Sequence, residues 1–233
     1  MQILKYMPNT FTALNLTSGC LGLLSIYEGD LFLGAMFILI GAVFDFLDGF
    51  TARILETTSE IGKQLDSLAD LATFGMVPAF MMYYVLEEQG LHYISLVSLL
   101  LVVSSAFRLA RFNIDESQKM YFKGLPTPAN AFLVAGIIFA READWKIFSF
   151  IYDSIPSLII FIIVLSFLLN APFSFLSFKI KTFSFRGNEY ILMSVIVSLM
   201  CVFLFGLKGI FPATVFYMFF SLLRNLFMKG TSP

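Results

Sequence analysis

The chain is divided into long apolar stretches, each near the roughly 20 residues that an α-helix needs to cross a bilayer. Backbone groups in lipid must satisfy their own hydrogen bonds, which a helix does within one segment. In keeping with this, 58% of the residues are hydrophobic and 13% are charged. The sequence therefore predicts an all-α integral membrane protein, a polytopic bundle of about eight transmembrane helices. The expected spans are 11–28, 31–54, 64–86, 91–112, 125–141, 150–170, 190–206 and 209–228.

The breaks between these stretches are short and polar, so no segment is long enough to form a separate soluble domain. We therefore expect residues 1–233 to form a single membrane-embedded domain. The net charge of −1 provides no basic field for binding nucleic acid, which is excluded as a partner. The single histidine has no Cys or His partner at a metal-ligand spacing.

Basic residues predict the orientation. With the N-terminus in the cytoplasm and the chain alternating sides, all but three of the 15 Lys and Arg residues lie on the cytoplasmic side. The exceptions are Arg141, Lys146 and Lys208. Loops rich in Lys and Arg stay in the cytoplasm. We therefore expect a multi-pass protein of the cell membrane, with an even number of spans and both termini in the cytoplasm.

Four aspartates, Asp45, Asp48, Asp66 and Asp70, interrupt the second and third spans. A carboxylate at membrane depth costs roughly 2.5 to 3.5 kcal/mol and indicates function. Spacings of three and four place each pair on one helix face, and the chain reverses between the pairs. The four carboxylates should therefore meet in one pocket near the cytoplasmic helix ends, where they suit hard divalent cations. We expect two cations, Mg²⁺ or Mn²⁺ with Ca²⁺ as an alternative, in a phosphoryl-transfer site.

Small and basic residues accompany the first pair of acids. Gly49 and Ala52 would let a nucleotide or another helix approach the helix backbone, although such residues taken alone more often form a helix-packing notch. Arg53 could reach a phosphate, or its charged end could simply extend to the membrane surface. A cation transporter would also place acids inside a membrane, and it is the alternative from another functional class.

The pattern Asp45-x-x-Asp48-Gly49-x-x-Ala52-Arg53, eight residues, Gly62-x-x-x-Asp66-x-x-x-Asp70 resembles the signature of the CDP-alcohol phosphatidyltransferases. The resemblance implies a cytoplasm-facing cavity in which an alcohol displaces CMP from a CDP-linked lipid. It further implies that the first three aspartates hold one metal, that the third and fourth take part at a second, and that Asp70 is the general base. The residues that it assigns to the CDP-lipid are Asn9, Thr12, Gly49, Ala52, Arg53 and Ser59. For Asn9, capping of the first helix is the alternative.

The acceptor alcohol is suggested by three further segments. RLARFN at 108–113, GLPTP at 124–128 and FGMVPA at 74–79 are similar to the phosphatidylserine synthase branch of the family. This resemblance implies serine as the acceptor, with glycerol 3-phosphate or inositol phosphate as the alternatives. The candidates for binding its carboxylate are Arg108, Arg111, Lys63 and Lys123. All four could instead be anchors on the cytoplasmic side.

Two properties stay open at this point. The apolar surface does not distinguish a CDP-lipid with ester-linked acyl chains from one with ether-linked isoprenoid chains. A homodimer formed through the late spans is a further prediction.

Overall fold

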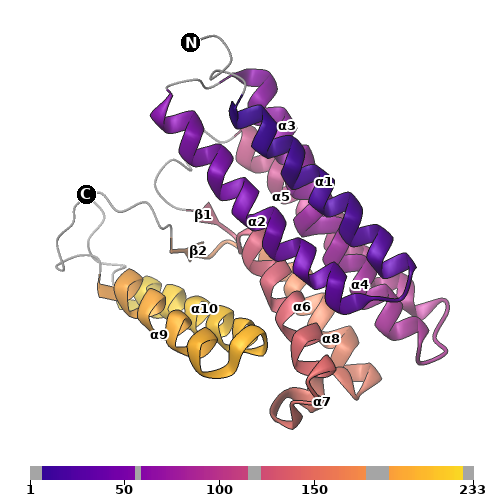
Figure 1. The fold of residues 1–233 in the computed structure, drawn as a ribbon. Coiled ribbons are helices and arrows are strands. Elements are labelled where there is room, and N and C mark those ends of the chain that lie inside the picture. Colours follow the sequence, from indigo (N-terminus) through magenta and orange to yellow (C-terminus); the bar gives the residue numbers. More distant parts are fainter. Residues whose placement is uncertain (1–6, 56–58, 115–121, 177–188, 228–233) are drawn as a thin grey trace.

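The computed structural model describes residues 7–55, 59–114, 122–176 and 189–227, and helices make up most of it (Figure 1). The predicted class of all-α membrane protein is confirmed. The long helices are α1 (Met7–Tyr27), α2 (Leu31–Ile54), α3 (Glu60–Asp70), α4 (Val77–Glu87), α5 (Leu99–Ile114), α6 (Thr127–Glu142), α8 (Ile155–Leu169), α9 (Glu189–Phe205) and α10 (Ile210–Phe227). The short elements are η2 (Leu71–Met76), η3 (Ile94–Ser98), η5 (Lys146–Phe148), α7 (Ser149–Tyr152), η6 (Gly206–Gly209) and the antiparallel strands β1 (Phe122–Lys123) and β2 (Ser174–Phe175).

Helices α1 and α2 form an antiparallel hairpin. The turn uses Gly29 at a φ of 86°, a conformation that glycine adopts without steric cost. Asp30 then caps α2, because its Oδ1 accepts a hydrogen bond of 2.8 Å from the backbone N–H of Leu33. The start of α1 and the end of α2 consequently lie at one end of the bundle, together with the start of α3 (Figure 1).

The third span is one helical run, from Glu60 to Glu87, with a change of winding inside it. Immediately after Asp70, residues Leu71–Met76 are π-helical, a form that is rare and frequent at functional sites. Close packing accompanies this segment: a Cβ on Gly75 would lie 3.1 Å from the Cβ of Ser105 on α5. The predicted span 64–86 is thus found, and its irregular part begins directly after Asp70.

Helix α6 occupies the centre of the bundle and is buried on most of its surface. Its Gly136 allows α10 to come close, since a Cβ there would lie 2.5 Å from the backbone N of Phe211. On another side the ring of Phe139 packs edge-on against Phe32 of α2, with centroids 5.2 Å apart. Helices α2 and α10 are therefore both held against α6.

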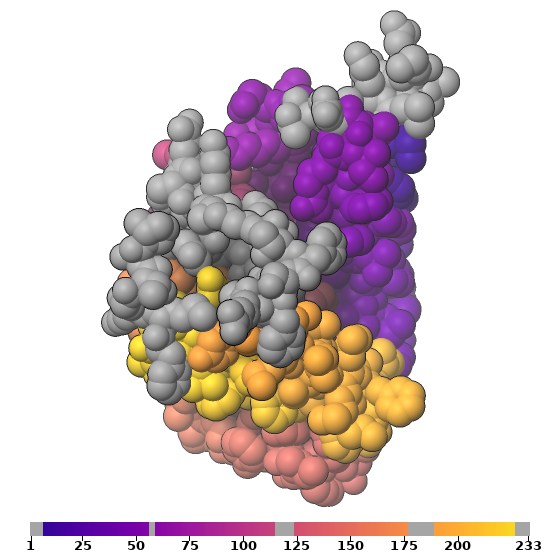
Figure 2. All heavy atoms as spheres, turned by 90° about the vertical axis from the view of Figure 1, so that its left-hand side faces the viewer, coloured from indigo at the N-terminus to yellow at the C-terminus, as the bar shows by residue number. Residues whose placement is uncertain are grey.

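Helices α9 and α10 form a second hairpin, closed at Gly206 with a φ of 63°. The two helices are joined by a hydrogen bond of 3.1 Å from the Ser198 hydroxyl to the carbonyl of Ala213. Figure 2 shows this hairpin, in orange and yellow, on the same face of the molecule as α2 in purple. Large apolar side chains of α9 such as Phe203 are exposed, as expected of a helix that meets lipid.

The described residues contain four helical segments long and apolar enough to cross a membrane, and five if the pair Lys146–Tyr152 and Ile155–Leu169, bent by 83°, counts as one span. Helices α1, α6 and α8 coincide closely with expected spans but fall outside these four. The count of eight spans therefore stays a prediction.

Candidate active site

The predicted carboxylates meet at the end of the bundle shared by α1, α2 and α3. Asp45 and Asp48 come from α2, and Asp66 comes from α3. One carboxylate oxygen of each of these three residues lies within 4.8 Å of the others. The fourth carboxylate, that of Asp70, is half-buried beside them and lies close to Asp45. The spacing of three on one helix and four on the next produces this convergence because the helices share one end.

Helix α1 supplies polar side chains to the aspartates. The Thr12 hydroxyl lies 2.8 Å from Asp48 Oδ2 and 3.0 Å from the carbonyl of Pro8, and it can donate to either acceptor. Thr12 is 3% exposed. The sequence predicted Thr12 as a contact of the CDP-lipid. Its neighbour in the structure is a carboxylate of the cluster, and the lipid contact stays a prediction.

Asn15 is a residue that the sequence reasoning missed. Its Nδ2 donates to Asp70 Oδ1 at 3.3 Å, and its backbone carbonyl accepts a hydrogen bond of 2.8 Å from the Thr73 hydroxyl in the π-helical segment. A Cβ on Gly41 of α2 would lie 2.9 Å from Asn15 Oδ1, so three elements pack closely around this amide. The available signal was its position three residues after Thr12, on the same helix face.

The carboxylates fit a hard cation. The Oδ1 atom of Asp66 is buried and has no hydrogen-bond partner, although buried polar atoms normally have one. Three carboxylates within 4.8 Å of each other repel unless positive charge lies between them. All the atoms concerned are oxygens, the ligands that Mg²⁺, Mn²⁺ and Ca²⁺ prefer. The cluster of Asp45, Asp48 and Asp66 could therefore hold a metal ion.

The other residues assigned to the CDP-lipid lie around this end of the bundle. Gly49 has open space where a side chain would be, with no atom within 4 Å of an added Cβ. The exposed Arg53, one turn later, donates from Nε to the Gly49 carbonyl at 2.8 Å. Ser59 caps α3 by accepting from the backbone N–H of Gly62, and Asn9 faces Gly62 from α1. Ala52 is half-buried.

The structure separates the four basic candidates for the serine carboxylate. Arg108 is 8% exposed, donates from Nη1 to the Thr127 hydroxyl at 3.3 Å, and is near enough to Asp70 for their charges to interact. Lys63 donates a hydrogen bond of 2.6 Å from Nζ to the backbone carbonyl of Asn113. Arg111 is exposed in the last turn of α5. The side chain of Lys123 lies outside the described part of the chain.

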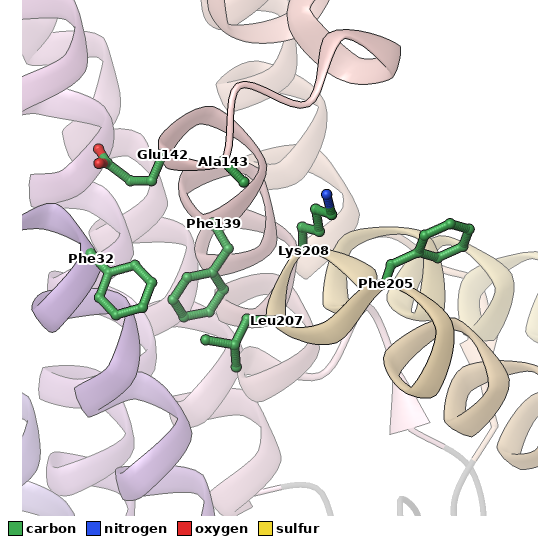
Figure 3. Close-up of a pocket in the computed structure, with 7 residues that line it drawn as sticks. All are labelled: Phe32, Phe139, Glu142, Ala143, Phe205, Leu207 and Lys208. Atoms are coloured by element: carbon green, nitrogen blue, oxygen red, sulfur yellow. The ribbon is translucent and has the colours of Figure 1, made fainter.

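A cavity of about 460 Å³ lies at the opposite end of α2 and α6. Figure 3 shows Phe32, Phe139 and Leu207 forming an apolar wall, with Glu142 and Lys208 on opposite sides of it. Phe32 is 13 residues before Asp45 on the same helix, which corresponds to about 20 Å. This cavity is therefore separate from the carboxylate cluster.

The sequence is similar to a family of membrane enzymes and to several of its members. The sequence pattern of the CDP-alcohol phosphatidyltransferase family matches residues 5–171. The chain is 31% identical to a CDP-diacylglycerol–serine O-phosphatidyltransferase of Helicobacter pylori, over 97% of this chain and 93% of that protein. It is 35% identical to the enzyme of the same name from Bacillus subtilis, over 54% of this chain and 71% of that protein. An archaetidylserine synthase of Methanothermobacter thermautotrophicus is 35% identical over 55% of this chain and 56% of that protein.

Proposed function

Because the chain belongs to the CDP-alcohol phosphatidyltransferase family, we propose that it transfers the phosphatidyl group of a CDP-linked lipid to the hydroxyl of L-serine and releases CMP. The observation that carries the proposal is the group of three carboxylates within 4.8 Å, with Asp70 beside them. This group lies in a chain that is similar over 97% of its length to a serine phosphatidyltransferase. The chain is thus a membrane-bound transferase of phospholipid biosynthesis.

The chemistry is a displacement at the phosphorus that carries the lipid. A bond forms between the serine oxygen and this phosphorus, the bond from phosphorus to the CMP oxygen breaks, and the serine hydroxyl proton moves to Asp70. A neutral hydroxyl is a weak nucleophile and needs a base within hydrogen-bond reach. Asn15, which donates to Asp70 Oδ1, holds the carboxylate that is proposed to receive the proton. Asp70 is therefore proposed as the catalytic residue.

Asp45, Asp48 and Asp66 are proposed to hold one divalent cation, and Asp66 with Asp70 to take part at a second, with Mg²⁺ or Mn²⁺ as the expected metals. When bound, such cations neutralise a pyrophosphate and polarise the attacked phosphorus. Thr12 orients Asp48 by its hydrogen bond. Gly49 and Arg53 flank the cluster on α2: the open space at Gly49 suits a nucleotide, and Arg53 suits a phosphate.

Arg108 is proposed as the residue that binds the serine carboxylate. Among Arg108, Arg111 and Lys63 it is the one that is buried and close to Asp70, where a bound amino acid would present its hydroxyl. A guanidinium can hold a carboxylate with two parallel hydrogen bonds. Relatives of the chain include enzymes named for diacylglycerol and for archaetidyl lipids, so the proposal covers CDP-lipids of both kinds.

The test is the release of CMP by purified protein given CDP-diacylglycerol, Mg²⁺ or Mn²⁺, and a panel of labelled alcohols. Labelled lipid should form with L-serine. If CMP is released with glycerol 3-phosphate or an inositol compound and serine is ignored, the assignment of the acceptor is wrong while the family chemistry stands. If CMP is released with none of the alcohols, the transfer function itself fails.

The active site and both termini are proposed to face the cytoplasm, in a single domain that forms a homodimer through its late helices. The basic residues support this orientation. In a protein with Cys20→Ser and Cys201→Ser, a cysteine replacing the exposed Glu60 should resist an impermeant thiol reagent added to intact cells. A cysteine replacing the exposed Gln89, at the other end of the third span, should react. The reverse pattern would overturn the orientation.

A further inference from the structure

Asn130, in the first turn of α6, is a buried polar residue that the proposed mechanism does not use. It is fully buried, and both Nδ2 and Oδ1 lack a hydrogen-bond partner. An amide offers two N–H donors and an acceptor, and leaving all of them unpaired inside a protein is costly. Such a group indicates a bound partner that completes its hydrogen bonds.

The surroundings of Asn130 are polar. It follows Thr127 by three residues, so both side chains project from one face of α6, and Thr127 accepts the hydrogen bond from Arg108. The Nε of Arg108 is also buried without a partner. Phe211 of α10 lies against Gly136. Tyr217, also on α10, is near enough to Arg108 for their charges to interact.

Asn130 lies at about the same depth in the bundle as Asp70, the proposed general base. Phe139 packs against Phe32 of α2, which runs antiparallel to α6. Equal rise along the two helices then places Asn130 about level with Gly41. A side chain at Gly41 would meet the amide of Asn15, which holds Asp70. Asn130 and Asp70 are therefore at similar depths.

The polar groups at this depth lie on two sides of the bundle. The three carboxylates of Asp45, Asp48 and Asp66 lie on α2 and α3, whereas the unpaired atoms of Arg108 and Asn130 lie on α5 and α6. In a displacement at phosphorus, the attacking oxygen approaches from the side opposite the leaving oxygen. The α5 and α6 side is therefore where an acceptor would meet Asp70.

We propose that Asn130 is a binding and specificity residue for the acceptor amino acid, a role that rests on the proposed serine transfer. Its Nδ2 donates to the carboxylate together with Arg108 Nε, and its Oδ1 accepts from the ammonium group. A zwitterion satisfies both unpaired ends of the amide at once. An acceptor with only a phosphate gives Oδ1 no ammonium donor, so Asn130 selects amino alcohols that carry a carboxylate.

The experiment compares wild type with Asn130→Leu, which keeps the volume and removes every polar atom. The initial rate of CMP release is measured with CDP-diacylglycerol while L-serine or CDP-diacylglycerol is varied. The serine KM should rise about tenfold or more, since bonds to charged groups are lost. The KM for CDP-diacylglycerol should stay within about twofold. The matched control is Asn170→Leu, at an amide that also has an unpaired Oδ1 but bonds to the Ser104 carbonyl, and it should leave both KM values unchanged.

A second variant tests whether Nδ2 of Asn130 faces the carboxylate of the amino acid and Oδ1 faces its ammonium group. Asn130→Asp keeps an acceptor for the ammonium group but puts negative charge beside the carboxylate, so the preference for serine over ethanolamine should fall about tenfold or more. If Asn130→Leu does not accumulate as folded protein, Asn130→Ser should show the same rise in serine KM.

Three outcomes separate the possibilities. Serine KM values that are unchanged in the Asn130 variants, with melting temperatures lowered as in Asn170→Leu, would make Asn130 a structural residue that bonds to water and would overturn the proposal. An equal rise of both KM values would overturn it too. Wild-type protein that ignores serine but uses another alcohol would refute the proposed function first, and that result is visible before any variant is made.

Discussion

Replacing Thr12 by valine tests whether α1 orients the carboxylate cluster. The substitution exchanges a hydroxyl for a methyl group of similar size and removes the hydrogen bond of 2.8 Å to Asp48 Oδ2. Because Thr12 is 3% exposed, water cannot readily replace the lost donor. A hydrogen bond to a charged group contributes roughly 1.5 to 3 kcal/mol. This corresponds to a factor of about 10 to 150, close to the 10- to 100-fold losses typical when residues behind a metal ligand are changed.

The assay is CMP release as a function of Mg²⁺ concentration, at saturating serine and CDP-lipid. Thr12→Val should raise the half-saturating Mg²⁺ concentration about 10- to 100-fold, and high Mg²⁺ should restore most of kcat. The stabilisation of the protein by Mg²⁺ in a melting experiment should weaken in parallel. The matched control is Thr17→Val on the same helix, where the exposed hydroxyl bonds to the carbonyl of Ala13 within α1. It should behave as wild type.

The result also decides between two roles of Thr12. If Thr12→Val raises the KM for the CDP-lipid and leaves the Mg²⁺ requirement unchanged, Thr12 contacts the lipid substrate, as the family resemblance implies. If neither the KM for the CDP-lipid nor the Mg²⁺ requirement changes, the Thr12 hydroxyl donates its hydrogen bond to the Pro8 carbonyl. Thr12 then does not orient Asp48.

Three other predictions concern the site. Asp66→Asn, and wild type in chelator, should lose nearly all CMP release, and near-normal turnover in either would contradict a metal site. Asp70→Asn should mainly lower kcat while labelled CDP-lipid still binds to the purified variant, so a loss of binding would argue against Asp70 as the base. Arg108→Ala should raise the serine KM about 10- to 150-fold, whereas Arg111→Ala should change it little, and equal values would place the carboxylate elsewhere.

The class of fold and the aspartate cluster could be predicted because both follow from local pattern. Apolar length determines a spanning helix, and spacings of three and four determine which side chains share a face. The turn at residues 28–30 is equally local, since Gly29 adopts a positive φ and Asp30 caps the next helix. These features need no knowledge of how distant segments pack.

Other features of the site depend on packing between segments far apart in sequence. Asn15 looks like an ordinary polar residue in an apolar span until the close approach at Gly41 places it beside Asp70. The π-helical turn at residues 71–76 has no distinct sequence signature. Arg108 and Arg111 were equal candidates because they are three residues apart. They differ because α6 covers the first, whose Nη1 reaches Thr127, and leaves the second exposed in the last turn.

The distribution of unpaired buried atoms links the stability of the site to its function. Buried polar groups without partners are destabilising, yet Asp66 Oδ1, Arg108 Nε and both amide atoms of Asn130 are left in this state. By contrast, the buried hydroxyl of Thr73, which joins the π-helical segment to α1, is paired. Of these four atoms, Asp66 Oδ1 is an anionic oxygen beside α2, and the other three are two donors and one acceptor on α5 and α6; Asn15 Oδ1, beside Asp70, is unpaired as well. A cation with a pyrophosphate would satisfy the first group, and a zwitterionic alcohol would satisfy the second, so the two substrates would complete the hydrogen bonding of a bundle end that the chain leaves incomplete.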